Sequence, residues 1–385
     1  MPKICYIVTI PSTIHAFFVP QLKFLAENGF DVTVVCSHDE GLQDILGKKI
    51  RFYPIEIPRG ISVGGMLKAI YDLYCFFKKE KFDLVQYSTP NAAFCASIAA
   101  CLVNIRIRNY HLMGFRFLGA KGLGKIVLKH FEKLICVCST CIECVSQSNL
   151  KLGISERLFS ESKATVIWNG STGGVDLKKF DYIQKDQWRK EVRQELKLLE
   201  KDVVFGYVGR ITKDKGVNEL LQVFFHLQNS VKLLFVGSSE GIDTLDQQLW
   251  NWAKESDAVI IHDEVTDVER YFAAIDVLLL PSYREGFGNV IIEAGAMAVP
   301  SIVSDIPGPI DVVIDGQTGL ICRCKNVESL EDNIIKIMDN SKFKELGINA
   351  YEYVISHFDR EILCEKIMER KCCLLGEYVN ELKSM

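Results

Sequence analysis

Short apolar runs recur along this chain, and stretches with helical periodicity lie between most of them. In the first half the runs lie at 3–10, 31–37, 51–57, 83–88, 105–111 and 141–146. In the second half they lie at 203–208, 232–236, 258–262, 277–281, 300–304 and near 319–322. Strands that are apolar on both faces and alternate with helices are typical of a parallel sheet covered on both sides. The pattern therefore predicts an α/β chain with two doubly wound, Rossmann-like domains.

The amino-acid composition changes at 169–200, between the two series of apolar runs. This stretch begins with a turn-rich run, NGSTGGVD, and continues into densely charged sequence. We place the junction here, which gives a first domain at 1–180 and a second at 181–359. The last residues, about 360–385, are expected to form a helix that packs back on the first domain. A length of 385 residues suits two domains of ordinary size.

Charge is spread unevenly between the halves. Residues 1–180 hold 22 Lys and Arg against 14 Asp and Glu, whereas the remainder holds 23 against 35. A basic first half indicates a partner that is anionic. Nucleic acid usually requires a stronger bias and a recognisable module, so a phosphorylated substrate or an anionic membrane surface fits better.

The sequence also indicates a cytoplasmic protein. The longest nearly apolar run, Ala92–Val103, is shorter than the roughly 18 residues that span a membrane. The apolar stretch before Pro11 is too short for a signal peptide. The 14 cysteines lie in apolar segments, as expected of reduced, buried thiols.

The strongest local signal is the run PSYREGFGNVIIE, which joins an expected strand to an expected helix at 281–293. Ligands of parallel sheets bind at the carboxyl ends of strands, where free N–H groups and the helix dipole favour a phosphate. Gly286 and Gly288 allow close approach of the backbone, and Glu285 and Glu293 can accept hydrogen bonds from sugar hydroxyls. A plain strand–helix turn is the structural alternative. A carboxylate such as Glu293 in an apolar helix, however, needs a buried partner or a ligand.

A second loop, VGRITKDKG at 208–216, follows the first strand of the second domain. Arg210 offers a planar fork for phosphate and Lys215 a point charge. Taken alone, this loop fits a solvent-exposed basic loop without a ligand as well as it fits a phosphate site. Both loops would lie on the same edge of one sheet, so together they predict an anion site.

These runs resemble the retaining nucleotide-sugar glycosyltransferases of family 4, which have the GT-B fold. The resemblance rests on G-R-x4-K-G at 209–216, E-G-F-G-N-V-x2-E at 285–293, D-V-x3-P-S-Y-R-E at 276–285 and D-G-x-T-G-L at 315–320. The runs N-G-S-x2-G-V-D at 169–176 and T-x-P-x4-A-F at 9–17 are similar to the subset that builds bacterial surface polysaccharides. The resemblance covers nearly the whole chain and is most specific in the second domain.

The resemblance implies a role for each matching residue. Arg210 and Lys215 would hold the donor diphosphate, Glu293 the ribose hydroxyls, and Glu285 the donor sugar. The rest of the donor site would be Gly209, Gly286, Phe287, Gly288, Asn289 and Val290, with Val265 and Thr266 beside the nucleobase. The acceptor-side loop would hold Pro11, Ser12, Thr13 and His15. No metal or other cofactor is expected, in keeping with the lack of an Asp-x-Asp pair.

Breaking the anomeric bond builds negative charge on the diphosphate, which preorganised donors must stabilise. We find no convincing carboxylate nucleophile. A front-face path, in which the leaving phosphate accepts the proton of the attacking hydroxyl, fits the resemblance and needs no protein base.

His111 ends an expected strand of the first domain and is a candidate catalytic residue, because family members carry a histidine nearby. The subset often has a basic residue before the following glycine, where this chain has Met113, so a structural histidine is equally open. Four cysteines, Cys136, Cys138, Cys141 and Cys144, invite a zinc interpretation. Their compressed spacing and strand-like neighbours favour buried thiols instead.

Lysines recur every fourth residue from Lys121 to Lys133, with apolar residues between them. Such a helix either packs on the sheet with a solvated basic face or rests on anionic lipid. The helix near 65–80 could contribute aromatic side chains to the same surface.

The combined interpretation is a peripheral membrane enzyme on the inner face of the plasma membrane. It would move a hexose or N-acetylhexosamine, from a donor expected to be UDP-linked, to a lipid-linked saccharide in capsule, O-antigen or exopolysaccharide synthesis. The alternatives are an epimerase or hydrolase of nucleotide sugars with the same fold, or a non-catalytic sugar-nucleotide-binding protein. A nicotinamide-dependent oxidoreductase would need G-x-G-x-x-G after a first strand, which the sequence lacks.

Overall fold

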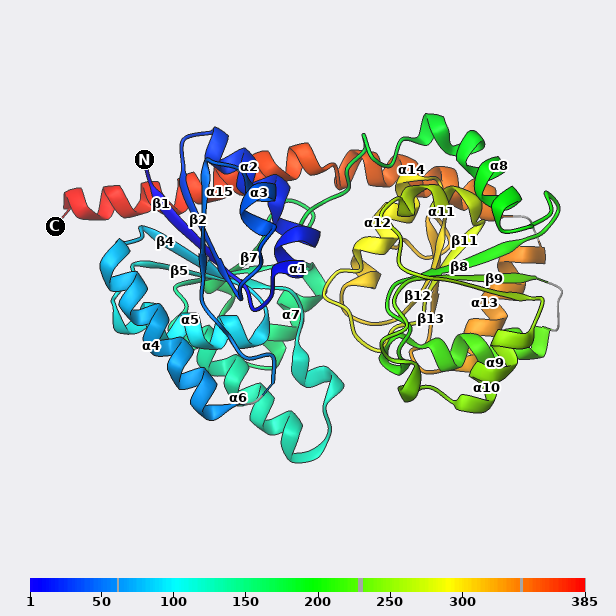
Figure 1. Ribbon diagram of the computed structural model, residues 1–385, viewed down its shortest axis with the longest axis horizontal. Coiled ribbons are helices and arrows are strands. Elements are labelled where there is room, and N and C mark those ends of the chain that lie inside the picture. The colour runs from blue at the N-terminus through cyan, green and yellow to red at the C-terminus, as the bar shows by residue number, and fades with distance from the viewer. Residues whose placement is uncertain (61, 228–230, 340–341, 385) are drawn as a thin grey trace. The chain divides into compact units, whose positions relative to one another are not determined.

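The computed structural model describes residues 1–60, 62–227, 231–339 and 342–384 (Figure 1). The chain divides into two compact units: residues 1–173 together with 361–385, and residues 174–360. The sequence places the boundary slightly later, at 180.

The first unit is built on a seven-stranded parallel sheet in the order β3-β2-β1-β4-β5-β6-β7. The strands are β1 (Lys3–Ile7), β2 (Asp31–Cys36), β3 (Ile50–Pro54), β4 (Leu84–Tyr87), β5 (Ile107–Leu112), β6 (Cys141–Cys144) and β7 (Ala164–Val166). The helices are α1 (Pro11–Thr13), α2 (Val19–Glu27), α3 (Leu42–Leu46), α4 (Val63–Glu80), α5 (Pro90–Leu102), α6 (Gly122–Cys138), α7 (Gln147–Ser155) and α15 (Arg360–Ser384).

Helices cover both faces of this sheet, as its doubly apolar strands require. Figure 1 shows α4, α5 and α6 on one face and α2, α3 and α15 on the other. Each face has its own core, one including Tyr87, Phe77 and Ile142, the other Tyr6, Phe18 and Leu374.

The second unit has a six-stranded parallel sheet in the order β10-β9-β8-β11-β12-β13. The strands are β8 (Val204–Val208), β9 (Lys232–Val236), β10 (Val259–His262), β11 (Val277–Leu280), β12 (Ser301–Ser304) and β13 (Gly319–Cys322). The helices are α8 (Lys185–Glu195), α9 (Val217–Leu227), α10 (Gln247–Glu255), α11 (Val268–Ala274), α12 (Asn289–Ala296), α13 (Val327–Asp339) and α14 (Phe343–His357).

The prediction of two doubly wound parallel sheets is confirmed. The expected C-terminal helix is α15; residue 385 lies outside the described residues. Within the described part of the chain, no helix combines the length and apolarity needed to cross a membrane.

Three local expectations were wrong. Residues 134–138, read as strand-like, form the last turn of α6, because Ile135 and Cys136 bury one helix face while Leu134 and Val137 stay exposed. The short edge strand β7 was missed, since its three residues are only half-buried. Pro11–Thr13, expected in a loop, form a helical turn with proline in its first turn, where its missing N–H costs nothing.

Candidate donor site

Two loops of the second unit meet at the carboxyl ends of β8 and β11, which are neighbours in the sheet. Gly216, directly before α9, has a positive φ of 75°. A Cβ atom at Gly216 would lie 2.2 Å from the carbonyl oxygen of Pro281 in the second loop. Only glycine permits this approach, so the contact fixes the two predicted anion-binding loops against each other.

An ion pair joins the same loops. Lys215 Nζ donates to Glu285 Oε1 at 2.6 Å, and the two side chains are 20% and 14% exposed. Ser282 Oγ donates to the same oxygen at 2.8 Å. Two predicted residues, Lys215 and Glu285, are thus brought together, whereas Ser282 was not singled out from the sequence.

Asp214 holds the two loops at a second point. Its carboxylate accepts from Thr212 Oγ1 at 2.6 Å and from Arg284 Nη2 at 3.1 Å. Its carbonyl oxygen accepts the backbone N–H of Tyr283 at 2.9 Å. The pKa of Asp214 is lowered, because these partners outweigh the effect of burial, so the carboxylate stays ionised. The sequence showed Asp214 only as a spacer between two lysines.

Arg210 leaves its guanidinium open to a ligand. Tyr207 Oη donates to the Arg210 carbonyl at 2.5 Å, which fixes the backbone of the loop. The side chain is exposed, and no described residue pairs with its guanidinium. Gly209, next to it, has φ of 143° and no backbone atom close to where a Cβ would stand. A fixed loop with a free cation suits an incoming anion.

The second loop ends where α12 begins. Gly288, at the N-cap, has φ of 90°, a left-handed conformation that favours glycine. Phe287 is buried and packs edge-on against Phe358, with ring centroids 5.5 Å apart. Residues 289 and 290 form the first turn of α12, whose N–H groups face the end of the loop. The loop is therefore anchored by an aromatic side chain at the point where α12 begins.

Glu293 lies on the next turn of α12 and is half-buried. Burial raises the pKa of its carboxyl to about 7, against the opposing effects of Lys179 and Arg360. An ionisable group poised near neutrality at a ligand site is typical of functional carboxyls. Lys179 Nζ also donates to the carbonyl of Thr266 at 2.9 Å and pairs with Glu269 at 3.4 Å. Thus Lys179, which sequence reasoning missed, contacts the predicted base loop at Thr266 and lowers the pKa of Glu293 electrostatically.

His111 is only 7% exposed and packs inside the first unit. Its Nε2 lies 3.2 Å from Thr172 Oγ1, and its ring stands edge-on to Phe18 at 5.6 Å. Burial lowers the pKa of His111 to about 4, so the ring is neutral at physiological pH. These contacts favour the structural alternative for this residue.

The residues of the expected acceptor-side loop lie at the start of the helical segment after β1. Ser12 is exposed, and Pro11 and Thr13 are half-buried. His15 is the second residue of a π-helical stretch, Ile14–Phe18, and its Nε2 lies 4.0 Å from Asp39 Oδ2. They are therefore near one another, with His15 close to a carboxylate.

The cysteine run shows no metal site. Cys136 and Cys138 end α6, and Cys141 and Cys144 belong to β6. Across the described residues, no group of three or more His, Cys, Asp or Glu side chains could hold a metal ion. Burial raises the pKa of Cys141 to about 11, as expected of inert thiols.

Comparison with known proteins places this geometry in a family. Residues 21–171 match the model described as Glycosyltransferase Family 4, and residues 189–353 match Glycosyl transferases group 1. The capsular polysaccharide biosynthesis glycosyltransferase CapM of Staphylococcus aureus is 33% identical over 369 residues, 95% of each chain. The chain belongs to glycosyltransferase family 4. It is therefore an enzyme, which removes the non-catalytic alternative.

A further relative and a solved structure are also similar to this chain. The UDP-Gal:alpha-D-GlcNAc-diphosphoundecaprenol alpha-1,3-galactosyltransferase of Escherichia coli is 25% identical over 95% of this family 4 chain and 96% of its own. Anabaena HepE, solved with UDP and with UDP-glucose, has TM-scores of 0.76 and 0.77 at 18% identity, covering 97% of this chain and all of that one. The fold of the chain is accordingly GT-B.

Proposed function

We propose that this family 4 enzyme transfers a hexose or N-acetylhexosamine from a UDP-sugar to a lipid-linked saccharide, with retention of the anomeric configuration. The second unit would bind the donor and the first unit the acceptor. The product would enter a capsule, O-antigen or exopolysaccharide.

The observation that best supports donor binding by the second unit is the close contact of the two loops at Gly216 and Pro281. It sets Lys215, the unpaired guanidinium of Arg210 and the first amides of α12 at one edge of the sheet. Charge that develops on a leaving diphosphate is stabilised by such preorganised donors, each worth roughly a hundredfold to a thousandfold in rate.

The roles of the carboxylates follow from their surroundings. Glu285 is held ready by Lys215 and Ser282, and it would accept hydrogen bonds from hydroxyls of the donor sugar. Glu293, whose charge is favoured by Lys179, would accept those of the ribose. Neither would have to act as a base, since the leaving phosphate can take the acceptor proton. Neither would have to act as a nucleophile, since the acceptor hydroxyl would attack from the face that the phosphate leaves.

The names of relatives support the substrate classes. The Escherichia coli relative is named for a UDP-linked donor and a diphosphoundecaprenol acceptor. The structurally similar HepE was solved with UDP-glucose. We extend the donor class and the acceptor class, without the particular sugars, to this chain.

A thermal-shift screen tests the donor class. The purified protein is heated with UDP, GDP or ADP, each with and without EDTA, and Arg210→Ala serves as the site control. Ligand at about 100 times Kd stabilises by roughly 2.7 kcal/mol. We expect a shift with UDP that EDTA leaves unchanged and that Arg210→Ala reduces. A shift with GDP or ADP alone would overturn the UDP assignment.

Product analysis tests the transfer itself. UDP-sugar is incubated with and without a diphosphate-linked lipid saccharide, and products are resolved by mass and by the anomeric NMR coupling. We expect a glycosylated lipid with unchanged configuration. Free sugar or an epimerised donor at equal rate in both reactions would favour the epimerase or hydrolase alternative.

We further propose that the first unit rests on the inner face of the plasma membrane. On α6, Leu123 and Ile126 are 80% and 53% exposed beside the exposed Lys121 and Lys125. On α4, Val63, Leu67 and Tyr71 follow at every fourth residue and are 62–70% exposed. Apolar side chains flanked by lysines suit anionic lipid.

Vesicle sedimentation tests this contact. Each lysine near an anionic surface contributes about 1 kcal/mol, so Lys121→Glu with Lys125→Glu should release the protein from phosphatidylglycerol vesicles. Lys254→Glu, a change on the exposed surface of α10 in the second unit, is the control. Equal sedimentation of both variants would contradict the proposal.

A further inference from the structure

Tyr283 joins the second donor loop to elements outside that loop. Its hydroxyl donates to Glu219 Oε1 on α9 at 2.6 Å. Its backbone N–H donates to the carbonyl of Asp214 in the first loop at 2.9 Å. Lys325, in the turn after β13, places its ammonium 4.5 Å from the centre of the tyrosine ring, a cation–π contact. Tyr283 is therefore held through its backbone, its ring and its hydroxyl.

The carboxylate of Glu219 has few partners of its own. Among the residues that the structure describes, the Tyr283 hydroxyl is the one group that donates to it. The second oxygen, Oε2, is buried and has no partner in that part of the chain. Leaving a buried polar group unsatisfied costs free energy, so this carboxylate depends strongly on its one partner. The contact therefore fixes the tyrosine hydroxyl firmly against α9.

The hydroxyl of Tyr283 keeps its proton. Burial, and next the hydrogen bond to Glu219, raise the pKa of Tyr283 far above its ordinary value. The phenol is therefore a donor throughout the physiological range, and the carboxylate is its acceptor. Hydrogen bonds to an ionised acceptor are about twice as strong as neutral ones.

This hydrogen bond joins the same two segments as the ion pair between Lys215 and Glu285. Lys215 and Glu219 lie on either side of the start of α9. Tyr283 and Glu285 belong to the second loop, with Arg284 between them. Two attachments this close together restrict rotation of the loop, which keeps Glu285 at its 2.6 Å contact with Lys215.

We propose that Tyr283 is a positioning residue for the donor sugar, because its hydrogen bond to Glu219 holds Glu285 where it accepts hydrogen bonds from sugar hydroxyls. The inference rests on the proposed function, which gives Glu285 that role. Tyr283 need not touch the donor. Precise placement of a binding group matters, since a shift of about 1 Å can cost a hundredfold in rate.

The variant Tyr283→Phe tests this role, because it removes the hydroxyl and keeps the ring. Calorimetry on the full chain measures the Kd of the nucleoside diphosphate and of the nucleotide sugar separately. We expect the Kd of UDP to stay nearly unchanged, whereas the Kd of the UDP-sugar rises about tenfold, the usual loss for one charged hydrogen bond. A tyrosine that only supports the fold would weaken both ligands or neither. Unchanged UDP binding also shows that the variant is folded.

Variants of Glu219 and Glu285 test whether Tyr283 acts through them. Glu219→Gln keeps an oxygen that accepts the tyrosine hydrogen bond and should bind nearly as the native chain does, whereas Glu219→Ala should match Tyr283→Phe. In the background Glu285→Ala, Tyr283→Phe should bring no further loss, because the group that it positions is gone. Additive losses in that background would overturn the proposal.

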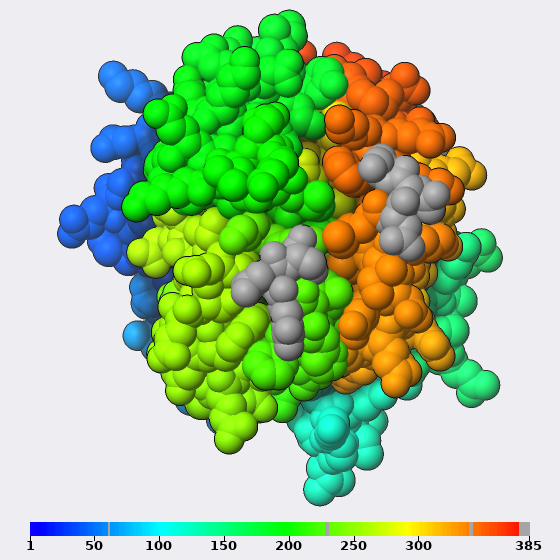
Figure 2. Space-filling view, turned by 90° about the vertical axis from the view of Figure 1, so that its right-hand side faces the viewer, coloured from blue at the N-terminus to red at the C-terminus, as the bar shows by residue number. Residues whose placement is uncertain are grey.

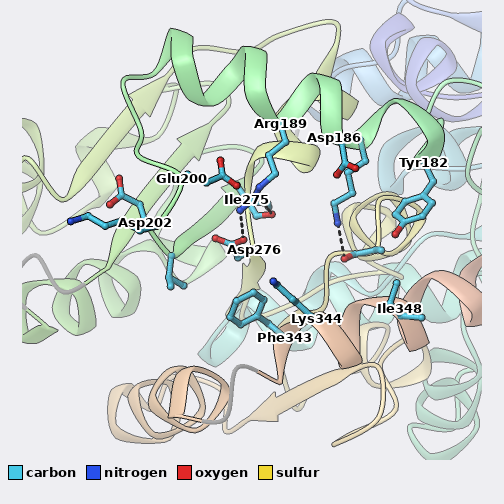
Figure 3. A pocket seen from close by; sticks show the side chains of 14 residues that line it. Tyr182, Asp186, Arg189, Glu200, Asp202, Ile275, Asp276, Phe343, Lys344 and Ile348 are labelled. Atoms are coloured by element: carbon cyan, nitrogen blue, oxygen red, sulfur yellow. Dashed lines mark hydrogen bonds and ion pairs between the residues drawn. The ribbon is translucent and has the colours of Figure 1, made fainter.

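Tyr182→Phe is the matched control. Tyr182 packs on Tyr351 with ring centroids 4.5 Å apart and lines a pocket that includes residues directly before β8, β11 and β12 (Figure 3). Residues before parallel strands lie at the amino edge of a sheet, whereas the donor loops lie at its carboxyl edge. On the face seen in Figure 2, residues around α8 (green), which follow Tyr182, lie beside those of α13 and α14 (orange). Loss of this hydroxyl should change neither Kd.

The choice of ligands separates this inference from the proposed function. The nucleotide sugars are the glucose and galactose derivatives, with and without the N-acetylamino group, of the nucleoside diphosphate that stabilises the native chain. A wrong UDP assignment therefore leaves the test intact. Equal binding of the nucleotide sugar by the native chain, Tyr283→Phe and Glu219→Ala would overturn the positioning role alone. A native chain that binds no nucleotide sugar would contradict the proposed function and this inference with it.

Discussion

Lys371 on α15 donates to both carboxylate oxygens of Glu143 on β6, at 2.7 and 3.0 Å, although 228 residues separate them. The lysine side chain is fully buried and the glutamate is 2% exposed. Lys371 also donates to Gln86 Oε1 at 2.6 Å. Burial alone would raise the pKa of Glu143, but the Lys371 ammonium outweighs it and the pKa is lowered. The Glu143 carboxylate therefore remains ionised inside the first unit.

Removing Lys371 should strongly destabilise the first unit. Lys371→Met leaves the Glu143 charge buried without its partner, which costs about 3–5 kcal/mol. The double variant Lys371→Met with Glu143→Leu should recover much of this loss, because no charge is then buried. Urea unfolding measures each variant. Lys366→Met, which breaks an exposed pair with Glu369 on the same helix, is the control, and equal stability of the two single variants would contradict the expectation.

Arg210→Ala should lower kcat by roughly a hundredfold to a thousandfold, because the unpaired guanidinium is the donor best placed to meet developing phosphate charge. Lys213→Ala changes an exposed cation of the same loop and should leave kcat within a few-fold. Steady-state kinetics with UDP-sugar and acceptor compares them. Near-normal kcat in Arg210→Ala would remove the charge-stabilisation argument.

Glu293 should make the stability of the chain depend on pH. Its folded pKa of about 7 lies above the unfolded value of 4.5, so the folded state holds its proton more tightly. The contribution of Glu293 to the free energy of unfolding is therefore full below pH 4.5. It is lost as the pH rises to about 7, by up to about 3 kcal/mol. Glu293→Gln, which cannot ionise, should gain stability relative to the native chain between pH 5 and 8. Parallel melting curves for the two proteins would refute this.

His111 should contribute to stability in the opposite direction. Its pKa of about 4 lies below the unfolded value of 6.5, so its contribution is full above pH 6.5 and is lost as the pH falls to 4. His111→Gln should make the melting temperature depend less on pH over this interval. At pH 7.5 its kcat should fall far less than that of Arg210→Ala. A large loss of kcat in a variant of native stability would instead show that His111 acts on substrate.

Thr172 provides the matching test of the hydrogen bond. Thr172→Val removes the hydroxyl that lies 3.2 Å from His111 and should cost about 1 kcal/mol, whereas Thr172→Ser keeps it. Equal melting temperatures for the two variants would show that this contact adds nothing to the fold.

The features that could be predicted from the sequence depend only on residues that are close together along the chain. Each long apolar strand can be recognised from its own residues. Both donor loops can be recognised from glycines and charged residues within a few positions of a strand. Gly216 and Glu285 could therefore be picked out without coordinates. Their mutual placement follows from the parallel order of β8 and β11.

Features that depend on distant partners could not be predicted. Nothing near Lys371 along the chain distinguishes it from Lys366 on the same helix, because its partner lies on β6. His111 sits at a strand end, where an exposed ligand is expected, yet Phe18 and Thr172 enclose it. The apolar run before Cys138 fits a strand or a helix equally well, and packing against the sheet decides it.

The Lys371–Glu143 pair also sets an order of events during biosynthesis. The second unit is one continuous segment, residues 174–360, but the first unit takes its last helix from residues 361–385. Domains tend to fold as the ribosome delivers them, N-terminal first. Glu143 gains its partner Lys371 only after the entire second unit has been translated. The first unit is therefore the first to be synthesised and the last to complete its fold.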